Sequence, residues 1–145
     1  MLRCAVNFEK TLAYAISIED SVPVTCGRCG DSDSESSDDL FMYRFARSAV
    51  IHVFEITVES ACKMMQHWIK INADINIAQK PKRELFRIAR DSGLIEDAES
   101  WWGLYDARNI TSHTYHEETA KEVYTIAKTF NGHIKEFIER LEGRL

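Results

Sequence analysis

Residues 40–72 read LFMYRFARSAVIHVFEITVESACKMMQHWIKIN, a stretch that holds no glycine and no proline. Residues return every three or four positions on two mainly apolar faces: Met42, Phe45, Ala49, Val53, Ile56, Ser60 and Met64 mark one, and Phe41, Phe54, Val58, Ala61, Met65 and Trp68 mark the other. This spacing predicts one long helix. The β-branched residues between Val50 and Val58 favour a strand locally, but the length and periodicity of the stretch outweigh them. Because a helix with two apolar faces is usually the central one of its fold, we expect the other helices to pack around it.

Four further helices are predicted on the same grounds, over residues 8–18, 81–93 and 97–112 and from residue 117 onward. Pro81 suits the first turn of a helix, where its missing N–H is not needed, and Gly93 is typical of a helix C-terminus. The chain holds only two prolines and six glycines, too few for the frequent turns of a β-sandwich or barrel. We therefore expect an all-α fold, an antiparallel up-and-down four-helix bundle with an additional short helix.

Charge is unevenly placed along the chain. The 145 residues carry a formal net charge of −5, from 23 acidic and 18 basic side chains. Five of the acids lie between Asp31 and Asp39, and without them acids and bases are equal in number. This balance excludes a strongly basic nucleic-acid-binding protein of the usual kind. Residues 21–39 offer too little apolar area to order themselves, so we expect a mobile acidic loop inserted in a single domain of residues 1–145.

Targeting and cysteine patterns favour a cytoplasmic protein. No apolar run approaches the roughly 18 residues of a membrane span, and Glu9 and Lys10 interrupt any signal-peptide core. The cysteines are then expected to be reduced. Cys26 and Cys29 form one CxxC pair, but no second pair follows to complete a zinc site. A loop with two incidental thiols is favoured over a regulatory disulfide, and we expect no metal and no cofactor.

Residues 106–115 read DARNITSHTY and gather polar side chains at the junction of two predicted helices. On one continuous helix Arg108 and His113 would point about 140° apart, so they meet on one substrate only if the helix ends between them or if two copies face each other. Guanidinium groups bind phosphate oxygens in pairs, and imidazole transfers protons near neutral pH. With no metal-ligand cluster beside it, the segment indicates metal-independent attack of an RNA 2′-hydroxyl on its own phosphodiester. On spacing alone, a helix-capping hydrogen-bond network explains such residues more often.

The spacing Arg108-x4-His113-x-Tyr115 resembles the motif of the HepT-like branch of the HEPN superfamily. The residues around it, and Phe54–Glu59 upstream, are similar to the nucleotidyltransferase substrate-binding proteins. The resemblance spans roughly residues 40–142. It implies a helical bundle that forms homodimers or higher even oligomers and that is partnered by a minimal nucleotidyltransferase.

Two functions follow from this resemblance. In the first, the chain is the ribonuclease toxin of a toxin–antitoxin pair: Arg108 binds the scissile phosphate, His113 acts as general acid or base, and the partner neutralises the toxin by adenylylating Tyr115. Asn109 and Ser112 would support ligand binding. In the second, the chain is a non-catalytic subunit that binds a nucleotide or another substrate for the nucleotidyltransferase. Whether the chain is an enzyme stays open between them.

Other polar and aromatic residues have two interpretations each. The densest basic cluster suits RNA or an acidic partner surface, and equally a solvated helix face: Lys80, Lys82, Arg83, Arg87 and Arg90. Arg44 and Arg47 likewise suit a phosphate-binding face or a solvated one. Trp101 and Trp102 lie about 100° apart on a helix, so we expect one in the core and the other at a subunit interface, in preference to base stacking.

Overall fold

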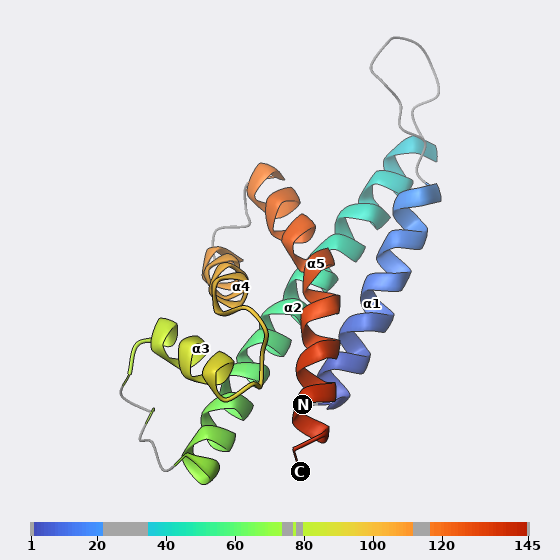
Figure 1. Ribbon diagram of the computed structural model, residues 1–145. Helices are drawn as coiled ribbons and strands as arrows, with labels where there is room; N and C mark the ends of the chain where they lie inside the picture. The colour runs from blue at the N-terminus through green and yellow to red at the C-terminus, as the bar shows by residue number, and fades with distance from the viewer. Residues whose placement is uncertain (1, 22–34, 74–76, 78–79, 112–116, 145) are drawn as a thin grey trace.

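Five helices form the described part of the computed structural model, which covers residues 2–21, 35–73, 77, 80–111 and 117–144 (Figure 1). They are α1 (Leu2–Ser21), α2 (Glu35–Asn72), α3 (Lys82–Asp91), α4 (Ala98–Ile110) and α5 (Glu117–Glu142). No strand occurs in these ranges, so the prediction of an all-α fold is confirmed. Within the same ranges, no helix combines the length and apolarity that crossing a membrane requires.

Three long helices form the body of the fold, and two short ones lie beside them (Figure 1). α2 has 38 residues, α5 has 26 and α1 has 20, whereas α3 and α4 have 10 and 13, so the fold has two short helices where the sequence predicts one. α1 runs antiparallel to α2 and to α5 (Figure 1). α2 and α5 begin at the same end of the molecule, because Arg47 near the start of α2 bonds Glu117 at the start of α5. α3 and α4 thus return the chain to the end at which α2 began.

An aromatic cluster joins four of the helices. The ring centroid of Phe130 in α5 lies 5.2 Å from those of Phe8 in α1 and Phe54 in α2, and 5.9 Å from that of Trp101 in α4. All four side chains are buried, which confirms Trp101 as a core residue, whereas Trp102 is half-buried. Because each ring comes from a different helix, their edge-to-face contacts fix how these helices pack.

The first two helices extend further than the sequence indicated. α1 begins at Leu2, and α2 begins at Glu35 rather than at Leu40. The predicted bounds of the mobile loop, residues 21 and 39, are therefore wrong. Ser21 is the last residue of α1, and Glu35–Asp39 form the first residues of α2. Acidic residues are favourable there, because the N-terminal end of a helix dipole is positive. Residues 22–34, which include the CxxC pair, lie outside the described residues.

The residues that predict the ends of the short helices lie at those ends or one position outside them. Pro81 immediately precedes α3 with φ −56°, and Gly93 follows this helix with φ 70°, a conformation that favours glycine. Asp97 caps α4 by accepting hydrogen bonds from the backbone N–H groups of Glu99 at 3.0 Å and Ser100 at 3.2 Å. The Ser100 hydroxyl, together with these groups, holds the pKa of the Asp97 carboxyl below its ordinary value.

Only one of the two apolar faces of α2 is buried within the chain. The buried face comprises Ala46, Val50, Phe54, Thr57, Val58, Ala61, Met65 and Ile69. On the opposite side Phe45 and Ile56 are 64% and 43% exposed, and Phe41, which the sequence spacing grouped with Phe54, also lies on this side and is 65% exposed. The prediction that α2 is the central helix is confirmed, because α1, α3, α4 and α5 all contact it, but together they leave one side of it exposed.

Candidate functional site

The motif of residues 108–115 lies between the end of α4 and the start of α5. Arg108 and Asn109 belong to the last turn of α4. Ser112, His113 and Tyr115 lie outside the described residues. Since α4 and α5 are separate helices, no continuous helix of the described structure holds both Arg108 and His113. The helix that holds Arg108 thus ends before His113, which is the condition stated above for both residues to contact one substrate.

Two carboxylates of α2 hold Arg108. Its Nη2 lies 3.1 Å from Oε1 of Glu59 and 3.6 Å from Oε1 of Glu55. Its Nη1 donates to Oδ1 of Asn109 at 3.4 Å, and its Nε is buried with no hydrogen-bond partner among the described residues. The side chain is 27% exposed, so a ligand can reach the guanidinium. A phosphate there would have to compete with the two carboxylates that now pair with the guanidinium.

The sequence alone did not identify Glu55 and Glu59 as site residues. They stand four positions apart and therefore on the same face of α2, which was the available signal. Their partner Arg108 lies far away in the sequence, and only the packing of α4 on α2 brings the three side chains together.

Arg47 is buried and anchors the start of α5. Its side chain is 4% exposed, and its Nη1 and Nη2 donate to Oε1 and Oε2 of Glu117 at 2.8 and 2.7 Å. Its guanidinium also lies 5.5 Å from the ring centroid of Tyr43, a cation–π contact. These hydrogen bonds from Arg47 hold the pKa of the Glu117 carboxyl below its ordinary value. The interpretation of Arg47 as part of a phosphate-binding or solvated face is therefore wrong, whereas Arg44 is exposed.

Both flanks of residues 112–116 are thus tied to α2. Arg108 on one side pairs with Glu59, and Glu117 on the other side pairs with Arg47. On α2 these two anchor points lie about 18 Å apart, at 1.5 Å per residue. A single rigid helix therefore positions both ends of the segment that carries His113 and Tyr115.

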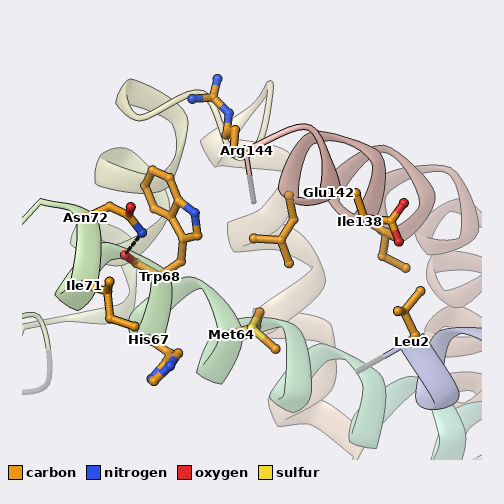
Figure 2. A pocket seen from close by; sticks show the side chains of 10 residues that line it. Leu2, Met64, His67, Trp68, Ile71, Asn72, Ile138, Glu142 and Arg144 are labelled. Atoms are coloured by element: carbon orange, nitrogen blue, oxygen red, sulfur yellow. Dashed lines mark hydrogen bonds between the residues drawn. The ribbon is translucent and has the colours of Figure 1, made fainter.

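A separate, apolar cavity of about 450 Å³ lies where α2 and α5 end (Figure 2). Its walls include Leu2, Met64, Trp68 and Ile138, which Figure 2 shows around the opening. No residue of the 108–115 motif is among the described residues that line it. The described part of the motif, residues 108–111, therefore does not line this cavity.

The predicted basic cluster of α3 makes contacts within the chain. Lys80 and Arg87 lie 3.9 and 3.3 Å from the carboxylate of Glu84, and the Arg83 guanidinium lies 4.7 Å from the ring centroid of Trp102. Such exposed contacts are weak and can be exchanged for others. An RNA-binding surface and a solvated face therefore both remain predictions.

Metal-binding side chains do not gather in the described ranges, where no group of three or more His, Cys, Asp or Glu residues could hold an ion. Cys62 is buried, and burial raises the pKa of its thiol to about 11. This thiol therefore carries little thiolate at neutral pH and is a poor nucleophile.

A sequence family described as nucleotidyltransferase substrate binding protein like matches residues 33–143. The match runs from the start of α2 to the end of α5 and contains the whole Arg108–Tyr115 motif. The chain belongs to this family. Membership of the nucleotidyltransferase substrate-binding family confirms the resemblance that the motif indicated.

Individual relatives of this family member agree with that assignment. The Haemophilus influenzae protein named "Probable ribonuclease HepT" is 35% identical over 100 residues, which are 67% of this chain and 68% of that protein. A Haemophilus influenzae structure described as the fold of a substrate-binding domain of a nucleotidyltransferase superposes with a TM-score of 0.69 at 23% identity, over 95% of this chain and 98% of that one. A crystal structure from Thermus thermophilus gives a TM-score of 0.62 at 24% identity, over 92% and 98% of the two chains. At these identities the two structures show a shared helical fold.

Proposed function

We propose that this chain is the helical partner of a minimal nucleotidyltransferase and that it cleaves RNA without a metal ion. The observation that carries the proposal is the position of Arg108, partly exposed at the end of α4 and directly ahead of residues 112–116. The family match and the relative named as a ribonuclease support the same reading.

In the proposed reaction Arg108 binds the non-bridging oxygens of the scissile phosphate. The RNA 2′-oxygen attacks phosphorus while its proton is removed, the bond from phosphorus to the 5′-oxygen breaks, and that oxygen takes up a proton. His113 serves as the general acid or base for these transfers. Asn109 and Ser112 contribute hydrogen bonds to the ligand. The products are a 2′,3′-cyclic phosphate and a 5′-hydroxyl.

Neutralisation by the partner follows from the same motif. The Tyr115 phenol oxygen would attack the α-phosphorus of ATP, and pyrophosphate would leave. The adenylyl group then places a bulky negative charge two residues from His113, where it competes with the RNA phosphate.

Incubation of the purified chain with its partner nucleotidyltransferase and ATP is expected to add the mass of AMP to Tyr115 and to stop RNA cleavage. Peptide mass spectrometry and a cleavage assay on the same sample measure both effects. Tyr115→Phe should stay unmodified and keep cleaving, while Tyr14→Phe, at an exposed tyrosine of α1, should behave as the unaltered chain. An unmodified Tyr115 with undiminished cleavage would contradict this mode of neutralisation.

A second candidate function is substrate binding for the nucleotidyltransferase without catalysis. It is favoured by the two carboxylates on Arg108, because a guanidinium already paired with Glu55 and Glu59 must reorganise before it binds phosphate. This function predicts tight association with the partner and nucleotide binding, with RNA left intact.

We also propose that two copies associate through the exposed face of α2. Phe41, Phe45, His52 and Ile56 follow one another at intervals of four or seven residues, and so share the side of the helix opposite its buried face. Exposed apolar patches of this kind mark interaction surfaces. A two-fold dimer would bury the same face of both copies.

Phe45→Glu is expected to weaken this dimer by at least about 100-fold, because a two-fold axis applies the loss of apolar burial and the added charge twice. Light scattering coupled to size-exclusion chromatography over a range of protein concentrations measures the change. Ile71→Glu is the matched control, since Ile71 is 66% exposed but lies at the other end of α2. A dimer equally stable in both variants would place the interface elsewhere.

A further inference from the structure

A small polar cavity lies beside Arg108, where α2 meets the end of α4 and the start of α5. Its volume is about 160 Å³, and its described walls are Ser48, Ile51, His52, Glu55, Thr111 and Ala120. Sites for drug-sized ligands usually measure roughly 300–1,000 Å³. This cavity is therefore of a size for one ring system rather than for a whole nucleotide.

Three of its four polar side chains offer hydrogen-bond acceptors to a ligand, and the fourth, His52, can donate or accept. The Ser48 hydroxyl donates to the backbone oxygen of Arg44 at 2.9 Å, and the Thr111 hydroxyl donates to that of Arg108 at 2.6 Å. Because a hydroxyl has a single hydrogen, both oxygens can only accept from a ligand. The Glu55 carboxylate adds further acceptors. The cavity therefore suits a ligand with N–H donors and disfavours an anion.

Apolar surface and a cation complete the arrangement. Ile51 and Ala120 are buried and provide contacts for the faces of a flat ring. Nη2 of Arg108 lies 3.6 Å from Oε1 of Glu55, so positive charge borders the acceptor-lined wall. A base inside the cavity and its phosphate outside, on Arg108, would satisfy both features at once.

We propose that this cavity is a base-binding subsite in which Glu55 selects a base with an exocyclic amino group, cytosine over uracil. The inference rests on the proposed function, since it assigns the nucleotide whose phosphate Arg108 binds. Cytosine presents its N4 amino donors where uracil presents the O4 acceptor. Glu55 accepts a hydrogen bond from the first and repels the second.

Isothermal titration of the full chain with CMP and with UMP tests the subsite without any cleavage step. CMP is expected to bind about tenfold more tightly than UMP. In Glu55→Gln the ratio should fall to about one, because the glutamine amide can present either its oxygen or its NH₂ group. Glu59→Gln is the matched control: it contacts the same arginine but is not among the described walls of the cavity, so it should keep the preference for CMP.

Equal binding of CMP and UMP by the unaltered chain would overturn the proposal, as would a preference that survives Glu55→Gln or disappears equally in Glu59→Gln. A Glu55-dependent preference for CMP in a chain that leaves RNA intact would support the subsite and remove the ribonuclease activity from the proposed function. RNA cleavage without any preference between CMP and UMP would rule out the subsite and support the ribonuclease activity.

Discussion

Arg108→Ala is expected to lower the rate of RNA cleavage by about 10²–10³-fold, the usual cost of removing one donor that stabilises charge in a transition state. The guanidinium offers two parallel N–H groups to phosphate oxygens, and alanine offers none. Single-turnover rates on a defined RNA oligonucleotide in the presence of a metal chelator measure the loss. His113→Ala should have an effect of similar or greater size, because general acid–base catalysis contributes about 10²–10⁴-fold.

Two controls separate chemistry from folding and from overall charge. The ion pairs of Arg108 with Glu55 and Glu59 are partly exposed to solvent, so their loss should cost less than about 1 kcal/mol of stability. Lys135→Ala removes the same charge from a side chain of α5 that is 52% exposed and lies outside the basic cluster of α3, and cleavage should not change. Full cleavage by Arg108→Ala would contradict the assigned role, as would an equal loss in Lys135→Ala.

Glu117→Gln is expected to lower the free energy of unfolding by about 3 kcal/mol, because it leaves the buried Arg47 guanidinium without its counter-charge. Arg44 and Lys121 also lie 3.9 Å from this carboxylate, so three cations share one anion. Urea unfolding followed by circular dichroism measures the effect. The comparison needs one fixed protein concentration, since dimerisation would add to apparent stability.

The companion change Arg47→Met tests this explanation. It removes the charge and keeps an apolar side chain in the buried position, while the partly exposed Glu117 regains water. We expect Arg47→Met to cost less than Glu117→Gln, and the double variant to be more stable than Glu117→Gln alone. Additive losses in the double variant would mean that the two side chains do not act as a pair.

Lowering the pH should reproduce part of the loss of folding stability that is expected for Glu117→Gln. The hydrogen bonds from Arg47 lower the pKa of Glu117 in the folded chain, so the pair contributes fully above the ordinary value of 4.5 and progressively less as the pH falls below it. The difference in stability between the unaltered chain and Glu117→Gln should therefore shrink below that pH.

Local sequence signals predicted the helices well because their causes are local. The apolar repeat of residues 40–72, the position of Pro81 and the left-handed Gly93 each depend on residues within a few turns. The same signals place the start of α2 too late in the chain, because an acidic run with few apolar residues predicts disorder, although acidic residues also favour a helix N-terminus. The periodicity of α2 likewise showed two apolar faces but not that one of them stays exposed.

The candidate site was predictable only in part. The Arg108-x4-His113-x-Tyr115 spacing could be read from the sequence and indicated both the family and the chemistry. That Arg108 is held by Glu55 and Glu59, and Glu117 by a buried Arg47, was not readable. These contacts join residues on different helices, and nothing in the spacing of one helix shows which face of another it will meet.

Local sequence features therefore predict an all-helical chain with an Arg-x4-His-x-Tyr motif at the junction of two helices, since helix periodicity and motif spacing are properties of neighbouring residues. The charge around that motif depends on tertiary packing. The packing of α4 and α5 against α2 gives Arg108 two carboxylate partners, buries Arg47 against Glu117, and leaves an acceptor-lined cavity beside the arginine. These features depend on side chains far apart in sequence, whose approach is set by the apolar core that packs the helices together.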